Sequence, residues 1–377
     1  MIRPAVVGIA CAGAATLALG TLALLGSQPT SGAGAWTGWT GRVDPQATAD
    51  RAAMTTDDAV ALALLARTAK ASSSLAWSGR AETTQGEQRS VADLVHLPRR
   101  GTIVTAVSPA PKPATLAPDG RSGTLADESR VLDLLIVNYR VLREADLDTR
   151  VGGRPADAVV AVTADGVTAA RFWLDHATGL LLRKDLLDPS GAVVRTVSMT
   201  SVRLGVPKET TVPPTGADKF GTVLDEPALA AARTRGCPCP EALPGGLSLV
   251  ESRQSQAGTL LAVPVVHQVF SDGLMTVSLF SAAGLLTDAD TAELRSKGFA
   301  PQGEGAGTAW VRSGTGSAWT AVWVAEGQVL TLAVSDAEDP AATASAVMQA
   351  LPSAVAQDDS LWSRIQRGWE RIFGSGS

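Results

Sequence analysis

Three histidines are the residues of this chain best suited to metal binding or to general acid–base chemistry: His96, His176 and His267. None of them has a partner at the spacing of a metal site. The sequence also lacks the nucleophile elbow, the zinc-protease motif and the phosphate-binding loop. We therefore predict that each histidine is a surface or hydrogen-bonded polar residue, and that the chain is not an enzyme and has no metal site and no cofactor.

Two cysteines that flank Pro238 are the next candidates for chemistry. Cys237 and Cys239 are one residue apart, and the third cysteine, Cys11, lies far away in the sequence, so a disulfide framework is excluded. In an exported protein this pair is a candidate redox pair or metal-binding pair, although a disulfide between them closes a small ring. The alternative, which we favour, is a pair of exposed cysteines in a linker.

An acidic cluster near residue 290 allows two interpretations. Asp288, Asp290 and Glu293 are spaced closely enough to bind calcium weakly. However, Thr287 precedes them, and a threonine followed by acidic residues is typical of the start of a helix. We favour the helix start.

The N-terminus carries the clearest physical signal. Residues 5–26 are apolar, and no charged residue occurs between Arg3 and Arg42. A helix of this length can cross a hydrocarbon core of about 30 Å, and the preceding Arg3 favours a cytoplasmic N-terminus and an exported C-terminus. Because residues 33–35 (Ala-Gly-Ala) resemble a cleavage site, residues 1–35 are predicted to be either a membrane anchor or a signal peptide.

Length and charge set limits on the rest of the chain. The 377 residues are enough for two domains, and 45% of them are hydrophobic, which is sufficient for a core in each. The formal net charge of −5 argues against nucleic acid as a partner, because binding to phosphates needs a basic face.

Composition and periodicity divide the remaining residues into five segments. They are a flexible tether at 36–56, a first domain at 57–205, a Pro-rich linker at 206–245, an α+β domain at 246–354 and a tail at 355–377. In the first domain, helical periodicity is expected at 57–71 and 125–139. Short strands separated by Asp/Gly turns follow at 157–162, 169–175, 180–187 and 193–204. Consecutive strands joined by tight turns form an antiparallel meander.

The tail contains an amphipathic pattern. Four large apolar residues fall on one face of a predicted helix: Trp362, Ile365, Trp369 and Phe373. Such a helix can lie on a membrane surface or in the groove of a partner. It can also pack against the chain's own domain, and the pattern alone leaves these alternatives open.

Two sequence blocks resemble a known family. Residues 153–204 contain a G-R-P-A stretch, a strand ending in W-L-D, a T-G-L-L-L hairpin and a D-P-S-G turn. Residues 265–280 read VVHQVFSDGLMTVSLF. Together and in this order they resemble the RseB/MucB family of sigma-factor regulatory proteins. The W-L-D and T-G-L-L hairpin by itself is also similar to LolA/LppX-like lipoprotein carriers.

The resemblance implies an α+β fold. The expected N-terminal domain is a half-open antiparallel β-barrel, LolA-like, with helices over its concave face, and a smaller α+β domain follows. The four residues that we expect to face the cavity are Trp77, Phe172, Trp173 and Leu181, with packing inside the core as the alternative.

The resemblance also implies a function. Proteins of this family bind the extracytoplasmic part of a membrane anti-sigma factor and modulate its proteolysis in envelope-stress signalling, with a lipid or acyl ligand as the displacing signal. This places the chain on the outer face of the plasma membrane, either anchored or secreted. The alternative is a lipid or lipoprotein carrier of the LolA/LppX type, although a second domain after residue 245 argues against a simple carrier.

Overall fold

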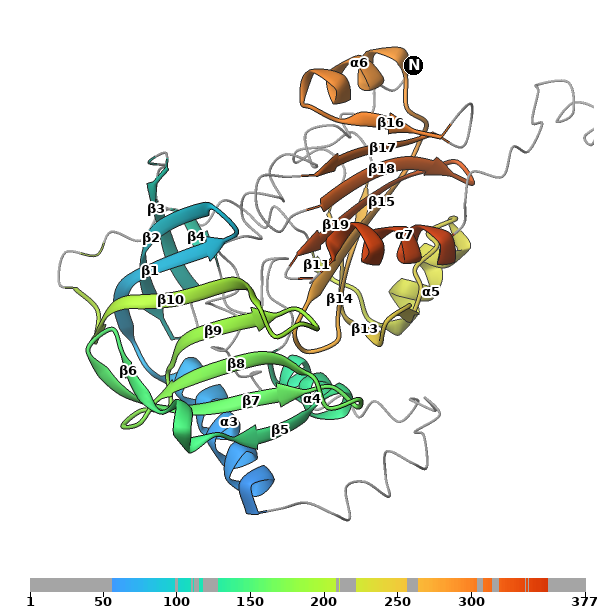
Figure 1. Ribbon diagram of the computed structural model, residues 1–377. Helices are drawn as coiled ribbons and strands as arrows, with labels where there is room; N and C mark the ends of the chain where they lie inside the picture. The colour runs from blue at the N-terminus through green and yellow to red at the C-terminus, as the bar shows by residue number, and fades with distance from the viewer. Residues whose placement is uncertain are drawn as a thin grey trace, which may run out of the picture.

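The protein, as a computed structural model, is built from two antiparallel sheets with few helices (Figure 1). The structure describes residues 56–351 except 99–100, 110, 112–114, 118–127, 208–209, 211–221, 256–263, 304–307, 314–318, 336 and 338. The predicted leader, the predicted tail and all but the last residue of the predicted tether lie outside the described residues.

The first sheet has ten strands in the order β4-β3-β2-β1-β10-β9-β8-β7-β5, with β6 paired to β7. Its strands are β1 (Trp77–Gln85), β2 (Gln88–Leu97), β3 (Gly101–Ser108), β4 (Thr115–Ala117), β5 (Arg140–Arg143), β6 (Thr149–Val151), β7 (Arg154–Val162), β8 (Thr168–Asp175), β9 (Leu181–Leu187) and β10 (Val193–Leu204). The predicted meander is confirmed from β7 to β10, and β10 then pairs with β1.

Local side-chain chemistry explains the tight turns of this meander. Between β9 and β10, one carboxylate oxygen of Asp188 accepts hydrogen bonds from the backbone N–H groups of Ser190 and Ala192. Gly191 in the same turn has a φ of 82°, a left-handed conformation that favours glycine. The turn therefore fixes the register of the two strands that it joins.

Helix α3 (Thr56–Ser74) packs on one face of the first sheet, as Figure 1 shows. Its acidic residues Asp57 and Asp58 lie in the first turn, where their negative charges interact favourably with the positive end of the helix dipole. Ala61 and Leu65, four residues apart, are fully buried against Phe172 of β8. The helix predicted at 57–71 is confirmed, and α4 (Glu128–Asn138) falls within the range predicted for the second helix.

The second sheet has nine strands in the order β11-β13-β14-β15-β19-β18-β17-β16, with β12 paired to β13. Its strands are β11 (Thr222–Val223), β12 (Ala242–Leu243), β13 (Leu247–Gln254), β14 (Val265–Ser271), β15 (Thr276–Ala283), β16 (Ala300–Gln302), β17 (Ala309–Ser313), β18 (Trp319–Ala325) and β19 (Gln328–Ser335). Helices α5 (Glu226–Thr234), α6 (Asp288–Ser296) and α7 (Pro340–Ala350) accompany it.

The start of α6 decides between the two interpretations of the acidic cluster. Thr287 and Asp290 form a capping box, in which each side chain accepts a hydrogen bond from the backbone N–H of the other residue. The predicted helix start is confirmed. Among the described residues, no group of three or more His, Cys, Asp or Glu side chains is arranged to hold a metal ion.

The segment predicted as a Pro-rich linker contains regular structure in its described part. Strands β11 and β12 both pair with β13, and α5 begins at an N-cap formed by Asp225 with a proline in its first turn. Residues 222–243 therefore pack with the second sheet.

The coarse fold class is confirmed, since both sheets are antiparallel and the helices are few. The first sheet is not closed into a barrel, because its described strand order ends at β4 and β5. The half-open barrel shape and the division into domains at the predicted boundaries stay predictions. None of the helices in the described part of the chain combines the length and apolar character needed to cross a membrane.

Candidate functional site

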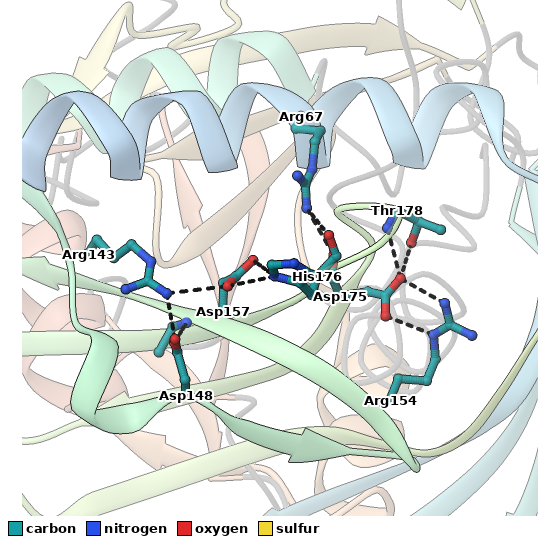
Figure 2. Close-up of polar contacts among 9 residues, drawn as sticks. Arg67, Arg143, Asp148, Arg154, Asp157, Asp175, His176 and Thr178 are labelled. Carbon is teal, nitrogen blue, oxygen red and sulfur yellow. Dashed lines mark hydrogen bonds and ion pairs between the residues drawn. The ribbon is translucent and has the colours of Figure 1, made fainter.

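The hairpin between β8 and β9 is held by an ion pair between a partly exposed arginine and a buried aspartate (Figure 2). The guanidinium of Arg154 donates two hydrogen bonds of 2.8 Å to the carboxylate of Asp175, whose side chain is only 1% exposed. The backbone N–H of Thr178 donates to the same carboxylate. Burial by itself raises the pKa of Asp175, but the hydrogen bonds from Arg154 and Thr178 outweigh it and hold the pKa below its ordinary value.

Helix α3 is attached to this hairpin by a side chain as well as by its apolar face. Arg67 donates to the backbone carbonyl oxygens of Asp175 and His176, over 3.1 Å and 2.8 Å (Figure 2). Gly179 lies beneath this arginine with a φ of 81°, and a Cβ there would approach the backbone of Arg67 to 3.2 Å. The glycine of the T-G-L-L sequence is therefore needed for both its conformation and its lack of a side chain.

His176 takes part in a second polar group on the same hairpin. Its Nδ1 lies 3.0 Å from both carboxylate oxygens of Asp157, and Arg143 bridges Asp157 to Asp148 (Figure 2). The His176 side chain is 71% exposed, so the prediction of a surface histidine is confirmed for this residue. His96 and His267 are buried instead, and they stack on Trp77 and Phe280 respectively.

A turn of the second sheet makes the contact with the first sheet. The turn joins β14 to β15 and contains Asp272, whose Oδ1 accepts hydrogen bonds from the backbone N–H groups of Leu274 and Met275. Its Oδ2 accepts a 2.8 Å hydrogen bond from the hydroxyl of Tyr139, and its backbone carbonyl accepts one from Asn138. The S-D-G-L residues of the second sequence block therefore connect the two sheets. We call each sheet with its helices a unit, the first unit containing β1 to β10 and the second β11 to β19.

Two further features show how closely this turn fits. Gly273 has a φ of 103°, and a Cβ at this position would lie 2.3 Å and 2.4 Å from the backbone N and Cα of Leu135 in α4. On the other side, Nζ of the buried Lys184 donates a 3.0 Å hydrogen bond to the carbonyl oxygen of Leu274. The backbone of the turn approaches the backbone of α4 so closely that residue 273 must be a glycine.

Lys184 is unusual because a cation is buried at the contact between the two units. Desolvation is the main reason that its pKa is lowered to about 8, and the positive charge of Arg195 lowers it further. The nearby carboxylate of Asp272 acts in the opposite direction. The protonation of Lys184 is therefore sensitive to how closely the S-D-G-L turn is docked.

A cleft of about 260 Å³ lies beside this contact. It is bounded by Tyr139, Leu186 and Leu187 from the first unit, and by Leu274, Met275 and Ala342 from the second. Among the described lining residues the charged ones are Asp272 and Asp339. The contact residues and this cleft together form the candidate functional site, which we call the interdomain cleft.

The four residues predicted to face a ligand cavity lie on two faces of the first sheet. Phe172 and Leu181 belong to the cluster under α3, whereas Trp77 and Trp173 belong to the cluster on the other face. All four are buried, and the indole N–H of Trp173 donates to the carbonyl oxygen of Leu147. They pack in two cores, so ligand binding by them stays a prediction. None of the four lines the interdomain cleft.

Cys237 and Cys239 form a disulfide. They are 8% and 1% exposed and pack with Leu229, Ala232 and Val266. The interpretation that they are exposed linker cysteines is therefore wrong, because α5 covers them. A redox role for the pair stays a prediction. The other predicted candidates, Trp362, Ile365, Trp369 and Phe373, lie outside the described residues.

Sequence reasoning did not find the interdomain contact. A partial signal was present, since Lys184 is one of three consecutive charged residues in the middle of β9 and the S-D-G sequence is typical of a turn. The pairing of Lys184 with residue 274, however, joins positions that are distant in the sequence, and neither position indicates the other.

The fold and these contacts define a protein of two antiparallel sheets that are joined through a structured turn. Residues 80–216 match the family model of the MucB/RseB N-terminal domain. This match covers 137 of the 377 residues and is to the N-terminal domain of that family.

Solved structures similar to the chain include that of MucB, with 20% identity, a TM-score of 0.49, and coverage of 78% of this chain and 98% of that chain. The structure of the Pseudomonas aeruginosa MucA/MucB complex is similar at 20% identity and a TM-score of 0.45, over 76% of this chain and 96% of that chain. A putative outer membrane lipoprotein-sorting protein domain from Vibrio parahaemolyticus has 13% identity and a TM-score of 0.20, over 42% of this chain and 95% of that chain. No curated protein matches the chain.

Proposed function

We propose that this protein is an extracytoplasmic regulator that binds the outer domain of a membrane anti-sigma factor and modulates its proteolysis. The observation that carries the proposal is the match of residues 80–216 to the MucB/RseB N-terminal domain. One similar solved structure is that of MucB in complex with MucA(peri), and we propose that this chain binds a partner of the same kind. The function requires binding and no catalysis.

The interdomain contact supports a role in binding a polypeptide. Asn138, Tyr139 and Lys184 hold the S-D-G-L turn by side-chain hydrogen bonds, so the two sheets present a common surface. Preorganised surfaces bind with a smaller loss of conformational entropy. We infer that the partner contacts both units near this turn.

The location and the signal are part of the same proposal. The apolar residues 5–26 export the protein, either as an anchor or as a signal peptide. A lipid or acyl ligand then displaces the anti-sigma factor and exposes it to its protease. The LolA/LppX-type carrier is the alternative function, and it predicts bound lipid without a protein partner.

A binding measurement tests the proposal. The full chain is titrated against the purified outer domain of the membrane anti-sigma factor from the same organism, with calorimetry or surface plasmon resonance as the readout. We expect saturable binding, and a longer lifetime of the anti-sigma factor in cells that produce the chain. Absence of saturable binding rejects the regulator, and acyl lipid that copurifies with such a non-binding chain supports the carrier.

A matched pair of variants locates the binding surface. Tyr139→Phe removes the hydroxyl that donates a hydrogen bond to Asp272. Arg80→Gln removes an exposed ion pair with Asp93 on the first sheet. We expect weaker binding for Tyr139→Phe and unchanged binding for Arg80→Gln. Equal affinities for both variants would place the partner away from the interdomain contact.

A further inference from the structure

The size of the interdomain cleft restricts what can occupy it. Pockets for small-molecule ligands have volumes of about 300–1,000 Å³, and this cleft has a volume of about 260 Å³. It is therefore too small to enclose an acyl lipid and is suited to one or two large side chains of a peptide. Aromatic side chains are the usual anchors in such pockets.

The chemistry of the cleft restricts the occupant further. Its walls combine apolar side chains, including Leu186 and Met275, with the carboxylates of Asp272 and Asp339. Asp272 is buried and accepts several hydrogen bonds, whereas Asp339 is exposed at the N-cap of α7. An apolar cleft with an exposed carboxylate at its edge, Asp339, favours a segment that has aromatic residues and a positive charge.

The chain itself supplies a segment of this kind. Residues 361–373 contain Trp362 and Trp369, and their three arginines (364, 367 and 371) against Glu370 give a net charge of +2. We propose that this segment, which we call the C-terminal segment, docks into the interdomain cleft of its own chain with a tryptophan inserted between the two sheets.

The attachment of this segment makes the contact attainable. Helix α7 lines the cleft near its start, at Ala342 and Thr343, and the described chain ends one residue after the helix at Leu351. The distance back along α7 is about 14 Å at 1.5 Å per residue. Residues 352–360 can span up to about 30 Å when extended, which covers this distance. A tethered segment reaches an effective concentration in the millimolar range, so even a weak site is occupied.

Docking of the C-terminal segment has a consequence for regulation. The segment covers the surface to which we assign the anti-sigma factor, so it competes with that partner. This consequence rests on the proposed function, whereas occupation of the cleft does not. The two are therefore tested separately.

Site-specific photo-crosslinking tests the docking in cells that produce the full chain. A benzophenone amino acid replaces Ala342, which is exposed and lines the cleft. The control replaces Gln349, which is exposed on the same helix, nearer to the C-terminal segment and outside the cleft. We expect position 342 to crosslink within the monomer to peptides from residues 361–373, at several times the yield of position 349.

Any of the following results would overturn the proposal. A higher yield from position 349 means that proximity alone produces the crosslink. A dimer-sized product identifies a second copy as the occupant, and a crosslink to phospholipid places the membrane there. A Trp362→Ala, Trp369→Ala double variant must lose the crosslink from position 342, and retention of the yield also overturns the proposal. None of these readouts requires the anti-sigma factor, so they remain informative if the proposed function fails.

Discussion

At the scale of single residues, one ion pair connects two parts of the first sequence block, residues 153–204. Arg154 of the G-R-P-A stretch and Asp175 of the W-L-D stretch are 21 positions apart in sequence and meet at 2.8 Å. Since β7 and β8 are antiparallel neighbours, the start of one strand lies beside the end of the other. Arg154 and Asp175 therefore have a structural role in this block, because they close the hairpin that α3 also contacts.

We predict that Arg154→Met destabilises the protein by about 3 kcal/mol, because it leaves the carboxylate of Asp175 buried without its cation. The matched control is Arg80→Met, which removes an equally bidentate but exposed ion pair with Asp93 and is expected to change little. Urea denaturation of both variants provides the measurement. Equal losses would show that burial of the Asp175 pair has no special importance.

The Arg154–Asp175 ion pair also predicts that the stability of the fold depends on pH in the acidic range. The pKa of Asp175 is lower in the folded protein than its ordinary value, so ionisation of this carboxylate stabilises the fold above the unfolded pKa of about 4. This contribution is lost as the pH falls through the folded pKa. We expect Asp175→Asn to be less stable than the parent at pH 7, with a difference that shrinks toward pH 3. A difference that is constant over this range would contradict the assignment.

The buried Lys184 predicts that the free energy of unfolding depends on pH in the alkaline range. Its pKa is about 8 in the folded protein and near 10.5 when unfolded, so between these values the unfolded chain binds more protons. The free energy of unfolding contributed by this group therefore rises from pH 8 to pH 10.5, and below pH 8 its burial has a constant cost. Lys184→Met is expected to lose this rise. Denaturation of the parent and the variant at pH 7.5 and pH 10 measures the difference between their slopes.

At the scale of elements, the turn between β14 and β15 has the most demanding geometry in the described part of the interdomain contact. Its glycine lies against the backbone of Leu135, and its aspartate organises the turn while accepting a hydrogen bond from Tyr139. The hydrogen bonds within the turn are local, so they form in the second unit by themselves. The turn is therefore a preformed element that docks on α4 and β9.

We predict that Gly273→Ala is more destabilising than Gly191→Ala. Both glycines have positive φ, which costs about 1 kcal/mol for alanine, but a Cβ at Gly191 meets no atom within 4 Å. At Gly273 the added Cβ overlaps the backbone of Leu135, so the turn must move away from α4. Thermal unfolding is the measurement, and similar melting temperatures for the two variants would show that the turn is not closely docked.

At the scale of the whole molecule, the two sheets are joined by hydrogen bonds to this turn and by apolar packing, with Leu274 in the cluster under α3 and Leu134 against Val250 and Val269. The described hydrogen bonds from side chains of the first unit to the turn come from Asn138, Tyr139 and Lys184. These few polar contacts hold a cleft that is bounded by both units.

We predict that the Asn138→Ala, Tyr139→Phe double variant uncouples the two units. Each lost hydrogen bond costs about 1–3 kcal/mol, with the larger value for the hydroxyl that donates to a carboxylate. Calorimetry is expected to show separate or broadened transitions, and small-angle scattering a larger radius of gyration. The control is Arg80→Gln, which should leave both unchanged. A variant that still unfolds in one transition of the original width would show that the apolar contacts are sufficient.

Sequence patterns determined the elements and their local order. The periodicity at 57–71, the Asp/Gly turns from β7 to β10 and the Thr287 cap are local signals, and each is confirmed because short-range hydrogen bonds and alternation decide it. The first sequence block, residues 153–204, lies within the range that matches the MucB/RseB N-terminal domain model, because a contiguous motif can be recognised without coordinates.

Only the tertiary structure decided which distant residues meet. It placed Trp77 and Trp173 on one face of the sheet and Phe172 on the other. It buried the Cys237–Cys239 disulfide under α5, and it brought Lys184 to the carbonyl of Leu274. The physical reason is that side-chain direction in a strand alternates with every residue, while contacts between units depend on long-range packing that no short window of sequence contains.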